Sequence, residues 1–261
     1  MAIVDRDHVG YARSAIESLL GQTYPLLDVH LMLSGPLPPD LRGLIEGVAV
    51  RSDRVILHIS AERRPLGVNL NALLQDTLGR YDLYARMDSD DESLPDRIGK
   101  QVGFLERHPE IDVVGGAVVD IDERGRELKR VAYPLTHDEI VRFFRKRTPV
   151  AHPTVMFRPT FFDKAGLYPA RPLEDGLYWM RAIASGCRFA NLPDTLVRLR
   201  RSDEMLRRRS GLRTNWEELK IRLTIDRTLG FGPAADAYGL AMFALQLTPL
   251  WLKRILYDRL R

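Results

Sequence analysis

Short apolar runs alternate with segments of helical spacing in the first part of this chain, and this alternation limits the folds open to it. Strands are predicted for the apolar runs at residues 2–4, 29–33, 55–59 and 83–87. Helices are predicted for the segments between them, at residues 11–20, 41–45 and 68–78. Strands that alternate with helices at this spacing are typical of a doubly wound α/β fold with a mainly parallel central sheet.

The rest of the chain mixes the two kinds of element. Helices are predicted at residues 97–107, 138–145 and 175–185. Strands are predicted at residues 111–121, at 154–157, near 189 and at 196–199. From about residue 211 the pattern is helical throughout. We therefore expect one large domain at residues 1–210 and a helical C-terminal extension at residues 211–261.

Three aspartates, Asp88, Asp90 and Asp91, follow the fourth apolar run and precede a helix start marked by Ser93 and Pro95. They are expected on a strand-to-helix loop at the carboxyl edge of the sheet, where open α/β sheets bind ligands. Such close carboxylates raise one another's pKa, and a bound divalent cation would relieve the repulsion. Mg²⁺ and Mn²⁺ suit these oxygen ligands. The alternative is a solvated acidic loop that caps the next helix.

A second acidic pair, Glu174 and Asp175, stands at a predicted helix start and is followed by Trp179 and Arg181. An acidic side chain at this place can simply cap the helix, because it accepts hydrogen bonds from the free amides of the first turn. It can also act as a general base if its surroundings raise its basicity. The pattern alone leaves both interpretations open.

The string from Arg86 to Arg97, with Lys100 and Gln101 after it, resembles the R-M-D-x-D-D-x-S-L-P-x-R-x-x-K-Q signature of family 2 glycosyltransferases. Residues 174–181 resemble the E-D-x-x-x-W-x-R element of the same family. The string H-P-T-V-M-F-R at 152–158 matches a subgroup that builds capsular polysaccharides and exopolysaccharides, the amylovoran-type transferases. The segment at 203–212 resembles the D-M-x-x-R-R-G-G-L string of that subgroup, with Ser210 in place of the first glycine.

The resemblance implies the Rossmann-like GT-A fold, with a nucleotide-sugar half at about residues 1–122 and an acceptor half at about 123–210. It also implies an inverting, metal-dependent glycosyltransferase that moves a sugar from a nucleotide diphosphate sugar, most simply a UDP-sugar, to a glycan acceptor. Asp88 would approach the ribose or diphosphate, and Asp90 would ligate Mn²⁺ or Mg²⁺ with Asp88 beside it. Asp175 would be the catalytic base.

Further residues are candidates for contact with the donor or with the acceptor. Glu174 and Trp179 are expected on the acceptor side. His152 is a candidate for contact with acceptor, diphosphate or metal through its neutral imidazole, or for a structural hydrogen bond. Donor contacts are expected from two acids at the end of the first strand and from four basic side chains, namely Asp5, Asp7, Arg86, Arg200, Arg201 and Arg207. The arginines could equally form a solvated basic face.

The chain departs from the family pattern at two places in the nucleotide-binding half. Ser34 and Gly35 replace the usual Asp-Gly, and Arg63-Arg64-Pro65-Leu66 replaces Asn-x-Gly-Leu. These changes favour an altered donor choice, and they keep open an inactive, glycosyltransferase-like binding or scaffold protein. A metal-dependent nucleotidyltransferase could use the same acidic loop, although the chain has no G-x-x-x-x-G-K-[ST] phosphate loop.

Composition bears on the compartment and the partners. The only cysteine, Cys187, is expected as a small buried residue, and one cysteine permits no internal disulfide, as in reducing compartments. The sequence has no signal-peptide core and no apolar run long enough to span a bilayer. The net charge is +4, yet no nucleic-acid reader motif accompanies the arginines, so nucleic acid is not an expected partner.

Residues 240–257 combine apolar side chains, Trp251 and Tyr257 with basic residues. This composition favours a helix pair that lies on an anionic membrane, where a lipid-linked glycan acceptor would be found. The alternative is packing on the catalytic domain or on a second subunit. We expect a cytoplasmic protein that is peripheral at the inner face of the cell membrane.

Overall fold

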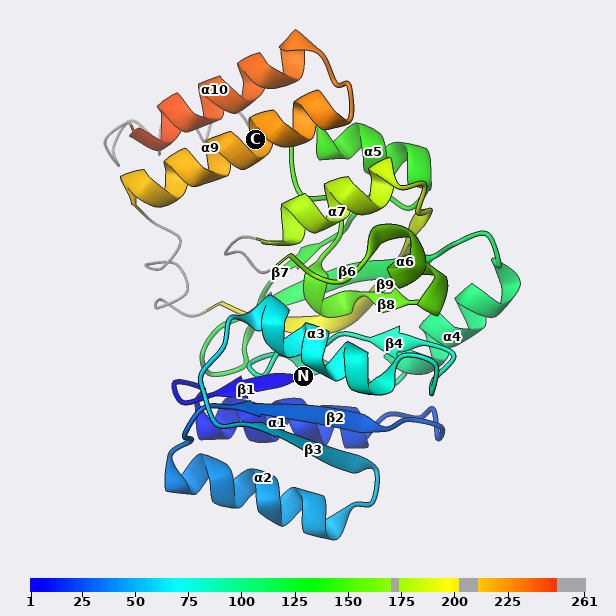
Figure 1. The fold of residues 1–261 in the computed structure, drawn as a ribbon, viewed down its shortest axis with the longest axis vertical. Coiled ribbons are helices and arrows are strands. Elements are labelled where there is room, and N and C mark those ends of the chain that lie inside the picture. The colour runs from blue at the N-terminus through cyan, green and yellow to red at the C-terminus, as the bar shows by residue number, and fades with distance from the viewer. Residues whose placement is uncertain (170–173, 202–210, 248–261) are drawn as a thin grey trace.

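The computed structural model describes residues 1–169, 174–201 and 211–247. Figure 1 shows a small sheet with two helices at one end of the long axis, a larger sheet in the middle, and a helix pair at the other end. The helix pair consists of α9 (Leu212–Thr228) and α10 (Pro233–Leu247). The fold is α/β, as predicted.

The first sheet is parallel and has the strand order β1-β2-β3. It contains β1 (Ala2–Val4), β2 (Val29–Ser34) and β3 (Val55–Ser60), and Ala2 lies opposite Met32. The connecting helices are α1 (Val9–Leu20) and α2 (Pro39–Arg51), and α3 (Leu66–Thr77) follows β3. Its core contains side chains that are fully or almost fully buried, such as Ile3, Ile16, Leu31, Leu33, Leu41 and Ile45.

The second sheet is mixed and has the order β4-β8-β6-β9-β5, with β7 beside β6. Its strands are β4 (Tyr84–Ala85), β5 (Glu92–Ser93), β6 (Val113–Ile121), β7 (Glu127–Val131), β8 (Met156–Phe157) and β9 (Phe189–Arg200). Only β6 and β9 pair in parallel. The glycine pair in β6 permits their close approach, because a Cβ atom on Gly116 would lie 2.5 Å from Cδ1 of Leu196.

The remaining helices surround this second sheet. They are α4 (Arg97–Arg107), α5 (His137–Phe144), the 3₁₀ turn η1 (His152–Thr154), α6 (Pro159–Ala165) and α7 (Glu174–Ala184). The second apolar core is largely aromatic and contains Phe157, Phe161, Tyr178, Trp179 and Phe189. Helix α9 packs against α7, so the C-terminal helix pair is attached next to the start of α7.

Several predicted elements need correction. The predicted helix at 41–45 extends over the whole of α2, and the two short strands near 189 and 196–199 are one strand, β9. Ser93 does not cap a helix: it lies in β5, where its amide donates to Oγ of Ser18 at 2.9 Å. The helix begins after Asp96 instead, and α6 and β7 were not predicted.

Two other predictions concern Cys187 and the C-terminal extension. Cys187 is buried, as predicted, and burial raises the pKa of its thiol to about 12, which rules out a reactive thiolate. In the C-terminal extension, the rings of Trp216 and Phe243 contact each other across the helix pair. Among the described residues, no helix is both long and apolar enough to cross a membrane. Membrane contact and the boundary at residue 210 stay predictions, and most of segment 240–257 lies outside the described residues.

Candidate active site

The loop between β4 and β5 brings three carboxylates together. One carboxylate oxygen from each of Asp88, Asp90 and Asp91 lies within 4.8 Å of the other two. Burial, followed by the charges of Asp88 and Asp7, raises the pKa of Asp90 to about 6. Burial and the charges of Asp88 and Asp90 also raise the pKa of Asp91. The folded protein therefore holds these acids close together against their electrostatic repulsion, which a bound cation would reduce.

The donor set at this loop fits a hard divalent cation. Mg²⁺ and Mn²⁺ prefer one or two carboxylates completed by phosphate oxygens and water. Asp91 is partly committed, because its Oδ1 accepts a hydrogen bond from the amide of Arg200 at 2.8 Å and the residue is only 3% exposed. Asp88 and Asp90 are more accessible, so these two side chains would hold the cation while Asp91 holds the loop.

A buried arginine fixes the start of this loop. Arg97 is fully buried, and its Nη2 donates to the carbonyl oxygen of Arg86 at 2.7 Å while its Nε donates to Oε1 of Gln101 at 2.9 Å. Burial, then the charge of Arg86, lowers the pKa of Arg97 to about 9. Gln101 in turn donates to the carbonyl oxygens of Val114 and Thr154. These contacts give Arg97 and Gln101 a role in holding the loop, which sequence analysis missed.

Arg86 connects the acidic loop with the start of α7. It is buried and forms an ion pair with Asp88, whose side chain is 32% exposed. Burial alone would lower the pKa of the Arg86 guanidinium, but Asp88 and the nearby carboxylate of Asp175 outweigh it and raise the pKa overall. Asp88 and Asp175, which are far apart in the sequence, therefore both lie within electrostatic reach of one guanidinium.

The predicted base, Asp175, lies in the first turn of α7 and pairs with His152. Its Oδ1 lies 2.9 Å from Nδ1 of His152, and Nε2 of His152 lies 3.1 Å from the hydroxyl of Tyr168. An ionised carboxylate only accepts hydrogen bonds, so Nδ1 of His152 carries a proton and donates to Asp175, while Nε2 faces the hydroxyl of Tyr168. Both ring nitrogens of His152 have partners and His152 is not part of the acidic cluster, so its predicted metal role gains no support and stays a prediction.

Trp179 lies beneath this pair. Its indole is fully buried, and its ring centroid lies 5.6 Å from that of His152 in an edge-on arrangement. The buried indole packs against His152 from inside the core, so a direct acceptor contact, as sequence analysis expected, would require a rearrangement. Glu174 begins α7, but its side chain lies outside the described part of the protein.

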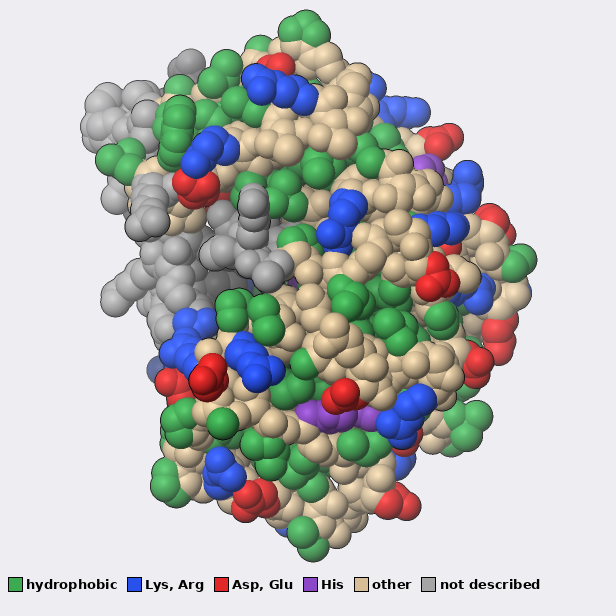
Figure 2. All heavy atoms as spheres, viewed as in Figure 1, with side chains coloured by type: hydrophobic (Ala, Val, Ile, Leu, Met, Phe, Trp, Pro, Cys, Tyr) green, Lys and Arg blue, Asp and Glu red, His purple; other side chains and the backbone are tan. Residues whose placement is uncertain are grey.

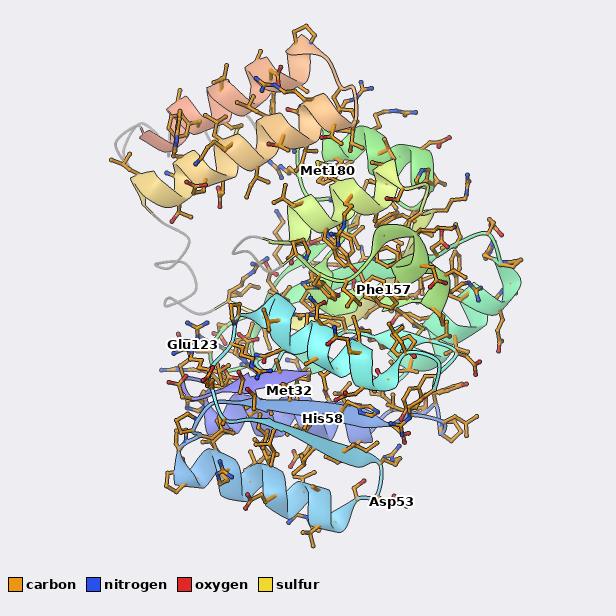
Figure 3. All side chains as sticks on the ribbon, in the orientation of Figure 1. Met32, Asp53, His58, Glu123, Phe157 and Met180 are labelled. Atoms are coloured by element: carbon orange, nitrogen blue, oxygen red, sulfur yellow. The ribbon has the colours of Figure 1, made fainter. Side chains whose placement is uncertain are left out.

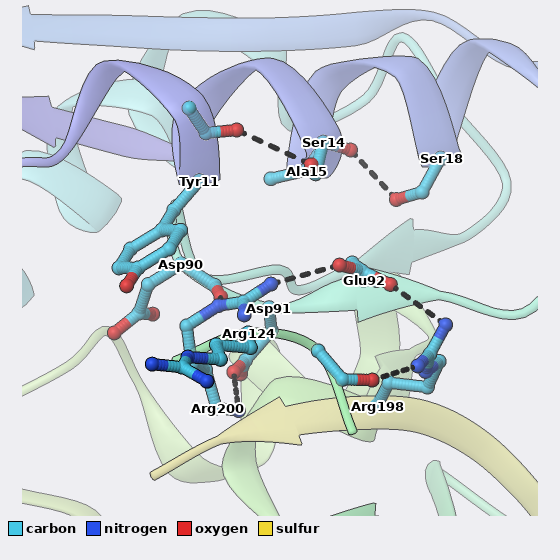
Figure 4. A network of polar contacts seen from close by, with 12 residues as sticks. Tyr11, Ser14, Ala15, Ser18, Asp90, Asp91, Glu92, Arg124, Arg198 and Arg200 are labelled. Atoms are coloured by element: carbon cyan, nitrogen blue, oxygen red, sulfur yellow. Dashed lines mark hydrogen bonds and ion pairs between the residues drawn. The ribbon is translucent and has the colours of Figure 1, made fainter. Parts of the chain in front are cut away.

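Arg200 ties the acidic loop to β9 (Figure 4). Its Nε donates to the carbonyl oxygen of Asp90 at 3.0 Å, and its Nη2 pairs with Oε1 of Glu92 at 2.8 Å. Its guanidinium also stacks on the Tyr11 ring, 4.2 Å from the centroid. These contacts give Arg200 a role in holding the loop, and its predicted contact with the diphosphate stays a prediction.

The two other predicted arginines give no direct support for diphosphate binding. Arg201 pairs with Oδ1 of Asp120 at 3.0 Å and is about one-third exposed. Arg207 lies outside the described residues. The donor contacts proposed for both therefore stay predictions.

The end of β1 contributes the two other predicted acids. Oδ2 of Asp7 accepts hydrogen bonds from the amide of Val4 at 3.0 Å and from the Ser89 hydroxyl at 2.8 Å. Burial raises the pKa of Asp7, which lies near enough to Asp90 to raise the pKa of that residue too. Asp5 is more exposed and pairs with Nη1 of Arg63 at 3.2 Å.

The two departures from the family pattern are joined in space. Ser34 is fully buried at the end of β2, and its hydroxyl oxygen accepts from the amide of Arg64 at 2.9 Å. The same Arg63-Arg64 segment carries the partner of Asp5. Serine at this place therefore fixes the loop after β3, where an aspartate would add a negative charge beside Asp5.

The geometry can be compared with known proteins. Residues 9–165, more than half of the chain, match the family described as Glycosyl transferase family 2. This chain belongs to glycosyl transferase family 2. The amylovoran biosynthesis glycosyltransferase AmsE of Erwinia amylovora is 33% identical over 249 residues, which are 94% of this chain and 91% of AmsE. This relative confirms the resemblance to the amylovoran-type subgroup. The Escherichia coli UDP-Gal:alpha-D-GlcNAc-diphosphoundecaprenol beta-1,3-galactosyltransferase is 25% identical, covering 85% and 80% of the two chains.

Solved structures of GT-A glycosyltransferases share the fold of this family 2 protein. Staphylococcus aureus TarS 1–349 in complex with UDP-GlcNAc has a TM-score of 0.66 at 17% identity, covering 94% of this chain and 71% of that one. The Pyrobaculum calidifontis mannosyltransferase PcManGT in complex with GDP-Man and Mn²⁺ has a TM-score of 0.60 at 14% identity, covering 98% and 77%. The chain is thus a glycosyltransferase with the GT-A fold, as predicted.

Proposed function

We propose that this family 2 glycosyltransferase moves a sugar, with inversion, from a nucleotide diphosphate sugar to a hydroxyl group of a glycan. One observation carries this proposal: Arg86 pairs with Asp88 of the acidic loop and also lies near enough to Asp175 for that carboxylate to raise the pKa of its guanidinium. A single displacement needs acids that bind the donor and a separate carboxylate nearby that takes the proton of the acceptor. The two kinds of group come from opposite halves of the chain.

In the proposed reaction, Asp175 accepts the proton of the acceptor hydroxyl. The hydroxyl oxygen forms a bond to the anomeric carbon while the bond from that carbon to the diphosphate oxygen breaks. The attack comes from the face opposite the leaving diphosphate, so the configuration inverts. Because one oxygen nucleophile comes from the acceptor, no covalent sugar-enzyme intermediate is needed. General base catalysis of this kind contributes about 10²–10⁴-fold to a rate.

His152 positions the base. Its Nδ1–H donates to Asp175 and holds one carboxylate oxygen in place, while Tyr168 and the buried Trp179 fix the ring. A base that is held in one orientation transfers protons faster than one that rotates freely. Asp175 takes up the proton that leaves the acceptor hydroxyl.

On the donor side, Asp88 and Asp90 would hold Mg²⁺ or Mn²⁺. When bound, such an ion neutralises charge on the departing diphosphate. The residues of this chain shape the site around it: Asp91 and Arg200 lock the loop, Arg86 orients Asp88, and Asp7 lies beside Asp90. The support is the acid cluster itself, together with similar folds solved with UDP-GlcNAc or with GDP-Man and Mn²⁺.

The biological setting is bacterial surface polysaccharide assembly, with a UDP-sugar as donor and a lipid-linked glycan as acceptor. The names of AmsE and of the diphosphoundecaprenol galactosyltransferase support this setting. A peripheral membrane contact would suit a lipid-linked acceptor. Leu212, Trp216 and Leu240 on the C-terminal helix pair are 71%, 51% and 51% exposed and could provide it.

The test is calorimetry with the diphosphates of uridine, guanosine, thymidine and adenosine, each with and without Mn²⁺, followed by hydrolysis assays on the matching nucleotide sugar. We expect Mn²⁺-dependent binding of one diphosphate and slow release of that nucleoside diphosphate from the sugar donor. Asp90→Ala should abolish both. Release of pyrophosphate would support a nucleotidyltransferase instead. A protein that binds none of the four diphosphates would support an inactive scaffold.

A further inference from the structure

Five polar side chains form a continuous chain of contacts that joins β2, β3, the last turn of α3 and the loop after α3. The hydroxyl of Tyr81 donates to Oδ2 of Asp28 at 2.7 Å and lies 2.8 Å from Nε2 of His30. Nδ1 of His30 lies 2.9 Å from Nε2 of His58, and Nδ1 of His58 lies 3.1 Å from Oδ2 of Asp76. Figure 2 shows histidine side chains in purple at the place where Figure 3 labels His58, with acidic and basic side chains next to them. None of the five belongs to the candidate active site.

The two carboxylates at the ends of this chain determine where its protons lie. An ionised carboxylate only accepts hydrogen bonds, so Nδ1 of His58 carries a proton that it donates to Asp76. Burial, then the hydrogen bond to Asp28, raises the pKa of Tyr81 to about 12, so the phenol keeps its proton and donates it to Asp28. The phenol oxygen of Tyr81 then accepts from an Nε2–H of His30.

The two ring nitrogens that face each other therefore carry no proton when both rings are neutral. A neutral imidazole has one N–H, which is used at Nδ1 of His58 and at Nε2 of His30. Burial lowers the pKa of His30 to about 4, and the positive charges of the Met1 amino group and Arg80 act in the same direction. His30 is thus neutral at pH 7. Two lone pairs 2.9 Å apart repel each other, and a cation bound between them would remove this repulsion.

The separation of the two facing nitrogens fits a metal ion. Zn²⁺ binds an imidazole nitrogen at about 2.0–2.1 Å, so two such nitrogens on one ion lie roughly 2.8–3.4 Å apart for angles of about 90–109° at the ion. The observed 2.9 Å lies within this range. Neutral imidazole suits Zn²⁺, whereas Mg²⁺ and Mn²⁺ prefer oxygen ligands such as those of the acidic loop.

The outer hydrogen bonds hold both rings in the orientation that metal ligands need. A histidine that binds a metal usually donates its other N–H to a carboxylate or another acceptor, which fixes the ring and raises its basicity. His58 donates to Asp76 in this way, and His30 donates to Tyr81, which in turn donates to Asp28. The two carboxylates also offset the positive charge of a bound ion.

We propose that His30 and His58 form a Zn²⁺ site, with Nδ1 of His30 and Nε2 of His58 as its protein ligands. Among the described residues, these two belong to no larger group of possible ligands, so water completes the coordination. Water can reach the ion because the His58 side chain is 15% exposed. Bound Zn²⁺ fixes both rings and, through Asp76 and Tyr81, ties the end of α3 and the loop after it to the first sheet. The site does not depend on the proposed reaction.

Calorimetry and melting curves of the full chain with ZnCl₂ at neutral pH test the site, in excess Mg²⁺ to occupy the acidic loop. We expect one Zn²⁺ to bind per chain and to raise the Tm by about 5 °C or more at roughly 100 times its Kd. His58→Gln should remove this binding, because one of the two ligands is lost. Asp76→Asn should weaken it about tenfold, because the His58 ring loses its orienting partner.

His108→Gln is the matched control and should leave Zn²⁺ binding unchanged. His108 also pairs with a carboxylate, that of Glu110 at 3.3 Å, but its ring stacks on Phe104 and does not face a second imidazole. A parent chain that binds no Zn²⁺, or equal binding by the parent and His58→Gln, would overturn the proposal. So would a ¹⁵N spectrum that shows a proton between the two facing nitrogens at saturating Zn²⁺. Should His58→Gln fail to fold, the effect of Asp76→Asn, whose side chain is 59% exposed, must still appear.

Discussion

Nδ1 of His152 lies 2.9 Å from Oδ1 of Asp175, and the two side chains differ in exposure: 5% for His152 and 42% for Asp175. The buried His152 can thus orient Asp175, and the more accessible Asp175 can meet an acceptor. The hydroxyl of Tyr168 closes the other side of the imidazole. This arrangement gives the proposed base a fixed direction.

His152→Gln should lower kcat by about 10–100-fold, a part of the whole effect of a general base, because Asp175 loses its orienting partner. The Kd of the donor diphosphate should not change, since His152 is not part of the acidic cluster. The measurement is kcat and the acceptor KM against pH. Tyr168→Phe is the matched control and should have a smaller effect. An unchanged kcat in His152→Gln would exclude the positioning role.

Asp175→Asn should reduce transfer by at least about 10²-fold, because the amide cannot take the acceptor proton. Donor binding with Mn²⁺ should persist, since the acidic loop is untouched. Calorimetry with the donor diphosphate and a product assay on the same preparation separate the two effects. Normal turnover in this variant would show that another group is the base.

Within the acid cluster, Asp88 and Asp90 are proposed to bind the cation, whereas Asp91 holds the loop in place. Asp90→Asn should abolish the Mn²⁺-dependent part of diphosphate binding and leave the Tm near that of the parent, because it also removes repulsion. Asp91→Asn should instead lower the Tm, since its carboxylate accepts from the buried amide of Arg200. Metal titrations and melting curves on both variants test this. Equal effects of the two changes on Mn²⁺ binding would contradict the division.

Sequence analysis singled out the acidic loop and Asp175 because each stands in a short motif of neighbouring residues, which can be recognised without knowledge of the fold. It also predicted the fold class from the alternation of strands and helices. Periodicity, however, does not show which residues pair across the chain. β9 pairs with β6 over its length because Gly115 and Gly116 admit Asn191 and Leu196, a close approach that no single segment predicts.

The contacts that Arg200 and His152 make within the protein were not predicted from the sequence, and the physical reason is the same for both. Charge and residue type in the sequence suggest a ligand contact, but the partners that consume the hydrogen bonds come from distant segments. Glu92 and the carbonyl of Asp90 occupy Arg200, and Asp175 and Tyr168 occupy His152. Tyr168 belongs to no recognised motif, so only the structure identifies it as a partner of His152.

Arg200→Ala should lower the free energy of unfolding by about 3 kcal/mol, because removal of one member of a buried ion pair leaves unpaired groups behind. Arg201→Ala is the matched control: its pair with Asp120 is partly exposed, and we expect a loss of about 1 kcal/mol or less. Urea denaturation measures both. If Arg200→Ala kept full stability and lost diphosphate binding, Arg200 would be a donor contact after all.

The Met1 amino group should make stability depend on pH. Its pKa is about 5 in the folded protein, because burial disfavours the charged form, against a usual value of 8.0. Between these values the unfolded chain takes up a proton that the folded chain does not, so stability rises from pH 5 to 8, by up to about 1.4 kcal/mol per pH unit.

The matched control for this pH effect is a variant with Ser-Gly-Ser added before Met1, which moves the free amino group away from its buried position beside His30. The unextended chain should be the less stable of the two at pH 5.5, and the difference should shrink towards pH 8.5. Urea denaturation across this range measures it, with mass spectrometry to verify that Met1 is retained. Parallel stability curves for the two proteins would show that the amino group is not buried.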